Sequence, residues 1–345
     1  MRRGPRSGLF TMVAVHSSAR GPALGGCRLL HYDDSRAAVR DVLRLSRAMT
    51  FKSAVAGLPL GGGKGIILAP HPAAGVRRGL RADALRDFGD NVQALGGAYV
   101  TAEDVGTSAR DMEVIASRTN HVTGLSRRRG GSGDPSPWTA LGVETAIGVC
   151  CERVFGSPAL DGRTITIAGL GHVGARVATL CAKAGATLLV TDIDDSKRAF
   201  AGELGARWLQ PDAALEAEAD VYVPCALGGI LDHDSVMRLG APIVAGAANN
   251  QLADDEVAEL LAQRSVLWAP DFLVNAGGVI NISVELEPAG YDPRRARKLV
   301  RSIGDTLRRI FDDADATGAS PLAAAMALAR ERLAEAGGTA ATRPA

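Results

Sequence analysis

The sequence predicts an α/β protein of two domains, the second a Rossmann-type domain with a doubly wound parallel sheet. Three observations support this. The chain has 345 residues, more than one typical domain needs to bury a core. Short apolar runs alternate with segments of helical periodicity along most of it. A segment rich in Gly, Pro, Ser and charge, residues 126–137, separates two such regions and suits neither a helix nor a central strand.

The first region, residues 1–130, is expected to form an N-terminal α/β domain. Apolar runs at 9–15, 66–69 and 98–101 suit strands, and residues 35–49 show helical spacing. We place the hinge between the domains at 126–137.

The second region, residues 131–290, has the alternating pattern of a parallel sheet with helices. A helix is expected at 138–155, and the strands at 163–168, 186–191, 221–224, 242–245 and 266–269. C-terminal helices are expected over 291–336, one long helix from 293 to about 313 and another from 321 to 336. The tail 337–345 is expected to be disordered.

The composition excludes several classes of function. Hydrophobic residues make up 46% and charged residues 22% of the chain, as in soluble globular enzymes. With 39 basic and 38 acidic residues, no excess field favours nucleic acid or a membrane surface. The five cysteines and six histidines lack metal-site or redox spacing, so no metal is expected. No apolar run reaches membrane-spanning length, and the cytoplasm is the expected location.

A glycine turn follows the strand at 163–168. Gly169 permits the tight turn, Gly171 lets backbone approach a pyrophosphate, and Gly174 lets the next helix pack closely. Asp192 ends the following strand, where its carboxylate can bind ribose hydroxyls and would repel a 2′-phosphate. The pattern predicts an NAD site and favours NAD over NADP; the alternative is a structural glycine turn.

Two lysines, Lys52 and Lys64, carry the only charges between residues 49 and 70. In a dehydrated cleft, desolvation and mutual repulsion would let one of them lose its proton and act as a base. The alternative is that both extend outward to water. A phosphate loop is rejected, because Leu58 and Gly65 stand where that motif needs Gly and Ser or Thr.

An acidic pair, Glu103 and Asp104, follows the strand-like run at 98–101. Parallel α/β proteins place reacting groups at such strand ends, so one of the two is a candidate proton shuttle. The alternative is a carboxylate that caps the helix starting near Ser108.

Several blocks in a fixed order then carry a resemblance over nearly the whole chain. They resemble the glutamate/leucine/phenylalanine/valine dehydrogenases, specifically the leucine and valine branch. The blocks are Gly21-Pro-Ala-Leu-Gly-Gly26, Met49-Thr-Phe-Lys52 with Gly61-Gly-Gly-Lys64, Thr101-Ala-Glu-Asp-Val-Gly-Thr107, Gly131-Ser-Gly-Asp-Pro-Ser-Pro137, Gly246-Ala-Ala-Asn-Asn-Gln-Leu252 and Ala269-Pro-Asp-Phe-Leu-Val-Asn-Ala-Gly-Gly-Val-Ile280.

The resemblance implies NAD-dependent oxidative deamination of a small apolar L-amino acid, leucine or valine, to its 2-oxo acid and ammonia, without a metal. Lys52 would hold the substrate carboxylate, Lys64 would activate a water, and Asp104 would relay protons. It also implies a homo-oligomer, with residues 1–130 carrying substrate binding, catalysis and oligomerisation, residues 131–290 binding NAD, and the helices of 291–336 packing back toward the cleft.

The resemblance also names the other site residues. Substrate contacts would come from Leu24, Gly25, Gly26, Met49, Lys52, Ala102, Asn250, Val279 and Ile282. Cofactor contacts would come from Thr139, Gly169, Gly171, His172, Val173, Gly174, Asp192, Ala226 and Asn249. Which of Asn249 and Asn250 meets the substrate stays open. The apolar lining excludes glutamate, whose second carboxylate would be buried unpaired.

Two rival interpretations remain. One is an aromatic amino-acid dehydrogenase, because one or two methylenes in a pocket decide only a few kcal/mol. The other is a catalytically silent NAD-binding homologue. The chain begins close to the block at 21–26, where the resemblance leads us to expect a preceding helix and first strand, so an N-terminally extended protein is expected to be more stable.

Overall fold

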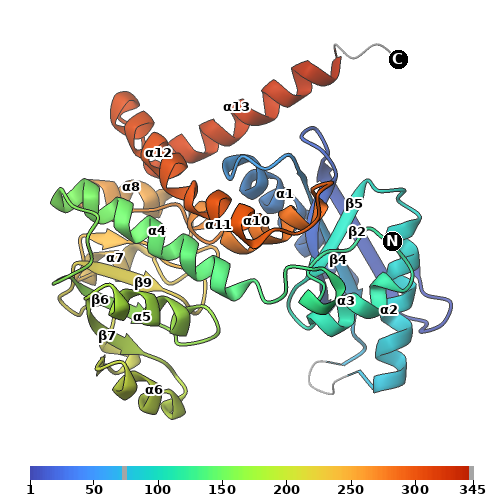
Figure 1. The fold of residues 1–345 in the computed structure, drawn as a ribbon, viewed down its shortest axis with the longest axis horizontal. Coiled ribbons are helices and arrows are strands. Elements are labelled where there is room, and N and C mark those ends of the chain that lie inside the picture. The colour runs from blue at the N-terminus through green and yellow to red at the C-terminus, as the bar shows by residue number, and fades with distance from the viewer. Residues whose placement is uncertain (72–75, 342–345) are drawn as a thin grey trace. The chain divides into compact units, whose positions relative to one another are not determined.

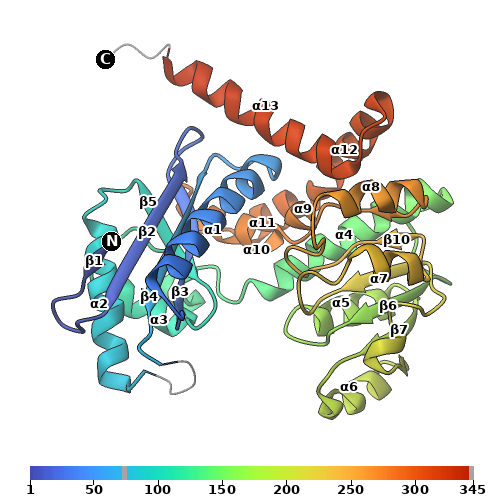
Figure 2. The same cartoon turned by 180° about the vertical axis from the view of Figure 1, so that it is seen from behind.

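The computed structural model describes residues 1–71 and 76–341 and separates them into two compact units (Figures 1 and 2). The first unit contains residues 1–134, 282–293 and the described residues from 329 onward; the second contains 135–281 and 294–328. The first boundary falls after Asp134, within the segment 126–137 where we placed the hinge. Each unit has its own sheet and its own core.

The first unit is built on a mixed five-stranded sheet in the order β1-β2-β4-β3-β5. Strands β3, β4 and β5 are parallel, while β2 runs antiparallel to β1 and β4. The strands are β1 (Arg2–Arg3), β2 (Phe10–Ser17), β3 (Ala23–Leu30), β4 (Gly61–Leu68) and β5 (Tyr99–Glu103).

Helices cover both faces of this sheet. Helix α1 (Ser35–Val55) packs on one face through Ala38 and Val42 against Met12 and Ile66 (Figure 2). Helices α2 (Arg78–Gln93) and α3 (Ala109–Ala116) cover the other face, over a larger core that contains Phe88, Tyr99 and Met112. Side chains alternate along each strand, so one set faces α1 and the other faces α2 and α3.

The second unit contains a six-stranded sheet in the order β11-β10-β9-β6-β7-β8, with every neighbouring pair parallel. This is the strand order of dinucleotide-binding domains, so the predicted Rossmann-type fold is confirmed. The strands are β6 (Thr164–Ala168), β7 (Thr187–Thr191), β8 (Arg207–Trp208), β9 (Val221–Pro224), β10 (Ile243–Val244) and β11 (Leu267–Trp268).

This unit contains the helices α4 (Ser136–Phe155), α5 (Gly174–Lys183), α6 (Arg198–Glu203), α7 (His233–Arg238), α8 (Glu256–Gln263) and α9 (Asp271–Val274). Of these, α5, α6, α7 and α8 lie between successive strands, whereas α4 precedes β6 and α9 follows β11. Short 3-10 turns are η1 (Arg127–Arg129), η2 (Asp195–Lys197), η3 (Pro211–Ala213) and η4 (Val284–Leu286).

The C-terminal part differs from the sequence prediction in two respects. The single helix expected from 293 to 313 is wrong: α11 (Pro293–Arg301) and α12 (Ile303–Thr317) are separated at Ser302, whose hydroxyl donates a 2.8 Å hydrogen bond to the Leu299 carbonyl. Helix α10 (Gly277–Ser283) precedes them, and α13 (Pro321–Ala341) follows. The tail expected to be disordered from 337 is helical through 341, and 342–345 lie outside the described residues.

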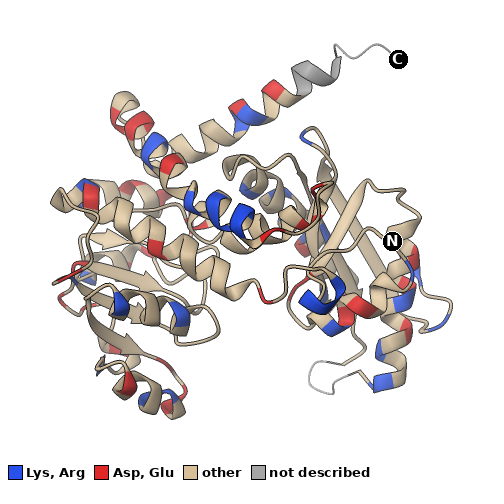
Figure 3. Ribbon diagram, in the orientation of Figure 1, with Lys and Arg blue, Asp and Glu red and all other residues tan. Residues whose placement is uncertain are grey.

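Charged residues of both signs are spread over both units (Figure 3). The clearest local concentration is on α11, with the sequence Pro-Arg-Arg-Ala-Arg-Lys-Leu-Val-Arg. In the described part of the chain, no helix is both long and apolar enough to cross a membrane.

Candidate active site

Three charged side chains share the face of the first sheet that α1 covers. Cys27 of β3 pairs in register with Gly65 of β4 and with Glu103 of β5. Successive side chains point to opposite faces of a strand. The residues next to these three in the chain, Arg28, Lys64 and Asp104, therefore all point to the opposite face from Cys27.

The ammonium of Lys64 lies against the carboxylate of Asp104. Lys64 Nζ is 2.6 Å from Asp104 Oδ2, and Lys64 is only 6% exposed. The outward-pointing alternative is therefore wrong for Lys64. Burial of Asp104 opposes its ionisation, but the charge and hydrogen bond of Lys64, with the charge of Arg28, outweigh burial and lower the pKa of Asp104.

The two acidic residues that end β5 have different surroundings. Helix α3 is capped by Ser108, whose amide and hydroxyl both contact Asp111 Oδ2, at 2.8 and 2.7 Å. Glu103 accepts a hydrogen bond from the amide of Ala109, and burial raises its pKa. Asp104 faces Lys64 instead. Asp104 therefore does not cap α3.

The glycines around Lys64 allow close packing. A Cβ atom on Gly62 would lie 2.0 Å from the amide nitrogen of Thr50 in α1, and one on Gly63 would lie 2.6 Å from the ring of Tyr99. Only glycine lets α1 and the tyrosine approach β4 so closely. These glycines lie inside a strand, and Lys64 is a strand residue.

The predicted substrate residues of the first unit lie on α1 and on the strands. Helix α1 runs past the expected end at 49 to Val55, so Met49 and Lys52 are three residues apart on one helix and neighbours on its surface. Leu24 and Ala102 are buried and share the strand face of Lys64. Gly25 accepts a 2.6 Å hydrogen bond from the Tyr99 hydroxyl through its carbonyl oxygen.

Gly26 lies directly beneath Asp104. A Cβ atom on Gly26 would be 2.6 Å from the Cβ of Asp104 and 2.8 Å from the Glu103 carbonyl oxygen. The missing side chain is therefore what lets Asp104 occupy its position. Val279 and Ile282, the other predicted pocket residues, lie on α10, the former in the second unit and the latter in the first.

The glycine turn of the second unit has the three properties that a dinucleotide needs. Gly169 has a φ of 103°, which favours glycine. A Cβ on Gly171 would meet nothing within 4 Å, whereas one on Gly174 would lie 1.9 Å from the Gly169 carbonyl oxygen. Gly171 thus borders open space, and Gly174 lets α5 pack against the turn.

The other predicted cofactor residues surround this turn. Asp192 Oδ2 accepts a 2.6 Å hydrogen bond from the Leu170 amide, and the Cβ of Ala226 is 2.8 Å from where a Gly169 side chain would begin. His172 is exposed, and Val173 precedes the first residue of α5. The room beside Gly171 and the carboxylate after β7 fit a nicotinamide dinucleotide.

A group of amides lies at the ends of β10 and β11. Asn275 donates to Asn249 Oδ1 at 2.9 Å and to the Ala247 carbonyl at 3.2 Å. Its own Oδ1 is buried without a hydrogen-bond partner in the described structure. Asn250 has a φ of 52°, and Thr139 donates to the Pro135 carbonyl at 3.3 Å.

Two further residues of these sites, Asn275 and Arg28, were not predicted from the sequence. Asn275 lies in the sequence block at 269–280. Arg28 lies two residues after Gly26 on the same strand face. The alternation of side chains along a strand could therefore have placed Arg28 on the face of the site.

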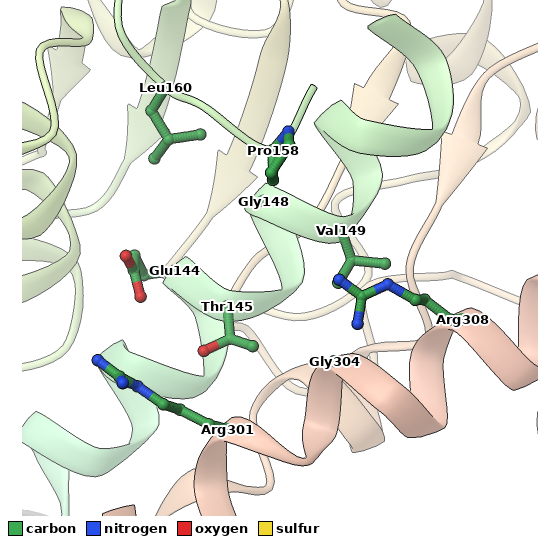
Figure 4. A pocket seen from close by; sticks show the side chains of 9 residues that line it. All are labelled: Glu144, Thr145, Gly148, Val149, Pro158, Leu160, Arg301, Gly304 and Arg308. Carbon is green, nitrogen blue, oxygen red and sulfur yellow. The ribbon is translucent and has the colours of Figure 1, made fainter. Parts of the chain in front are cut away.

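A separate cavity of about 310 Å³ lies between α4 and α12 (Figure 4). Its polar lining includes Glu144, Thr145 and Arg308. The Thr145 hydroxyl donates to the Leu141 carbonyl, and Arg308 pairs with Glu152, so Thr145 and Arg308 already have partners. None of the predicted site residues lines this cavity.

One group of potential metal ligands occurs among the described residues: His233, Asp254 and Glu256, all exposed. Asp254 already accepts hydrogen bonds from the amides of Glu256 and Val257 at the start of α8. We assign no role to this group.

Comparison with known proteins accounts for both units. Residues 3–121 match the model of the Glu/Leu/Phe/Val dehydrogenase dimerisation domain, and residues 190–339 match that of the Glutamate/Leucine/Phenylalanine/Valine dehydrogenase domain. Leucine dehydrogenase of Bacillus subtilis (strain 168) is 40% identical, over 95% of this chain and 88% of its own length. The chain belongs to the glutamate/leucine/phenylalanine/valine dehydrogenase family. This dehydrogenase is therefore an oxidoreductase that acts on amino acids with a nicotinamide cofactor.

Other members of the family are about as similar to this dehydrogenase. Valine dehydrogenase of Streptomyces virginiae is 43% identical, over 96% of this chain and 91% of its own. The crystal structure of L-tryptophan dehydrogenase from Nostoc punctiforme matches with a TM-score of 0.83 at 36% identity, covering 96% of this chain and 93% of its own. The family and fold are thus established, while relatives with aliphatic and with aromatic substrates are both similar.

Proposed function

We propose that this dehydrogenase catalyses the reversible NAD-dependent oxidative deamination of a small apolar L-amino acid, leucine or valine, to its 2-oxo acid and ammonia. The observation that supports this most directly is the contact between Lys64 and Asp104. These groups can exchange a proton across 2.6 Å, and they share a sheet face with the buried apolar residues Leu24 and Ala102.

In the proposed mechanism the nicotinamide, when bound, accepts a hydride from the substrate Cα. The ammonium of Lys52 binds the substrate carboxylate. Lys64, once its ammonium has released a proton to solvent, orients and deprotonates the water that attacks the resulting imine carbon. Asp104 takes a proton from the substrate amine and returns one as the carbinolamine releases ammonia. The lowered pKa of Asp104 keeps it ionised at neutral pH and therefore able to accept that proton.

The cofactor is proposed to be NAD. Asp192 places a carboxylate at the carboxyl end of β7, beside the glycine turn. A carboxylate binds ribose hydroxyls and repels a 2′-phosphate. Gly171 would face the pyrophosphate, and the buried Oδ1 of Asn275 offers an acceptor to an amide or amine of the ligands. Thr139, His172, Val173, Ala226 and Asn249 remain proposed cofactor contacts.

Preference for leucine or valine is supported by the bulk of Val279 and Ile282, which leave less room than smaller residues would. The apolar residues Leu24, Met49 and Ala102 support exclusion of a charged substrate side chain. An aromatic substrate is the competing proposal, which the similarity to L-tryptophan dehydrogenase supports.

Assembly and location are also proposed. The match of residues 3–121 to a dimerisation domain supports a homo-oligomer formed through the first unit. All five cysteines are free thiols, which supports a reducing compartment such as the cytoplasm.

The test is NADH formation by the full chain with leucine, valine, phenylalanine, tryptophan and glutamate, each with NAD and with NADP. We expect turnover with the branched substrates and NAD, and loss of that turnover in Lys64→Ala by a factor on the order of 10² or more. Faster turnover of the aromatic substrates would overturn the substrate assignment. Cofactor binding without any turnover would indicate a catalytically silent homologue.

A further inference from the structure

The carboxylate of Asp104 is held by two cations at the same oxygen. Oδ2 lies 2.6 Å from Lys64 Nζ and 3.1 Å from Arg28 Nε. The side chains of Lys64, Arg28 and Asp104 are 8%, 17% and 20% exposed, so water screens these charges only in part. Lys64 has an assigned role in the proposed reaction, and Arg28 has none.

Arg28 is itself fixed in orientation by a second carboxylate. Its Nη1 nitrogen lies 2.9 Å from Asp41 Oδ2 on α1, and the same oxygen accepts a 2.7 Å hydrogen bond from the Tyr32 hydroxyl. Arg44 binds the other oxygen of Asp41 at 2.9 Å. A guanidinium is planar and rigid, so binding Asp41 through one nitrogen fixes the direction in which its Nε meets Asp104.

We propose that Arg28, oriented by Asp41 and Tyr32, is a positioning residue of the reaction: it holds the carboxylate of Asp104 against Lys64 and shares its negative charge. This inference rests on the proposed role of Asp104. Without Arg28, Lys64 alone would neutralise Asp104, and the pair would hold its shared proton more tightly. With Arg28, a second positive charge lies at the carboxylate of Asp104 and favours its ionised form.

Two further titratable groups that act on Asp104, Cys27 and Tyr99, are neutral. Cys27 and Tyr99 are fully buried, and burial raises the pKa of each well above its ordinary value. Lys64 and Arg28 contact Asp104 directly, and Asp41 lies behind Arg28. Removing the charge of Arg28 favours protonation of the groups beside it.

The experiment compares the pH profiles of kcat and kcat/KM for the full-length enzyme and four variants: Arg28→Met, Arg28→Lys, Asp41→Asn and the control Arg86→Met. Arg86 forms an exposed pair with Asp83 on α2, on the opposite face of the sheet. In Arg28→Met we expect kcat to fall by about tenfold or more with little change in KM, because misplaced catalytic groups lose rate. The pH at which kcat/KM falls on the acid side of its profile should rise by about one unit.

The conservative variants separate charge from geometry. Arg28→Lys restores a charge without the fixed fork, so the acid-side pH dependence of kcat/KM should return toward that of the wild type while kcat stays low. Asp41→Asn keeps the charge of Arg28 but removes the ionic contact that fixes its orientation. We therefore expect kcat to fall while the acid-side pH dependence of kcat/KM does not shift upward. The control should match the wild type in both quantities.

A second readout does not depend on turnover. Carbon NMR of the Asp104 carboxyl, assigned with Asp104→Asn, should show titration at higher pH in Arg28→Met than in the wild type. Inactivity of the wild type would refute the proposed function and leave this readout to decide the inference. An unchanged carboxyl titration, or wild-type kcat and pH profile in Arg28→Met, would overturn the positioning role. Should Arg28→Met not fold, an unchanged kcat in folded Arg28→Lys and Asp41→Asn would overturn it equally.

Discussion

At the scale of single residues, the site of the first unit depends as much on missing side chains as on charged ones. Lys64 and Asp104 meet at 2.6 Å because β4 and β5, the parallel strands on either side of β3, carry them on one face. Gly26 leaves the space that Asp104 occupies. At the position of Gly26, a side chain would be tolerated if no carboxylate lay beside it.

Replacing Gly26 with alanine tests this arrangement. The new Cβ would lie 2.6 Å from the Cβ of Asp104, so the aspartate must move, and we expect kcat/KM to fall by roughly 10²-fold. Steady-state kinetics beside thermal melting measures both activity and folding. Gly202→Ala is the matched control, because a Cβ there meets nothing within 4 Å; equal activity of the two variants would refute the argument.

At the scale of elements, the three glycines of the turn between β6 and α5 have different roles. Gly169 has the positive φ, Gly174 permits the contact between α5 and the turn, and Gly171 faces open space. The first and third glycines therefore serve folding, whereas the second has no neighbour in the protein that requires it.

This difference predicts opposite behaviour of two alanine variants. Gly174→Ala places a Cβ 1.9 Å from the Gly169 carbonyl oxygen, so we expect a loss of about 1–3 kcal/mol in stability. Gly171→Ala should melt as the wild type does and bind NAD at least about tenfold more weakly. Chemical unfolding and calorimetric titration measure these quantities; unimpaired NAD binding by Gly171→Ala would contradict the assignment of the turn to a dinucleotide.

At the scale of the whole molecule, the first unit holds partly or fully buried carboxylates with lowered pKa values. In the first unit, burial opposes the ionisation of Asp87, Asp104 and Asp111, but hydrogen bonds and nearby cations outweigh it and lower each pKa. The side chain of Asp87, for example, is fully buried and binds Ser7 and Arg6. In the second unit, the pKa values of the exposed Asp194 and Asp232 are lowered, and the buried Asp271 accepts a 2.8 Å hydrogen bond from the Gln251 amide.

We therefore expect the first unit to unfold first in acid. A carboxylate with a lowered folded pKa binds fewer protons when folded, so its contribution is complete above the ordinary value of 3.8 and is lost as pH falls through the lower folded value. The three tryptophans, Trp138, Trp208 and Trp268, all lie in the second unit. Acid titration should thus change circular dichroism before tryptophan fluorescence; coincident transitions would contradict this order.

The sequence by itself determined the fold class, the glycine turn and the family, because periodicity, turn residues and ordered motifs are properties of local sequence. It also selected the pair Lys52 and Lys64 in an apolar segment, and the pair Glu103 and Asp104 at a strand end. The family resemblance then favoured Lys64 and Asp104 for proton transfer. Only the tertiary structure decided that these two meet, that Glu103 serves α3 instead, and that Arg28 and Asp41 complete the group. Register between strands far apart in the chain fixes those contacts, and no local pattern encodes it.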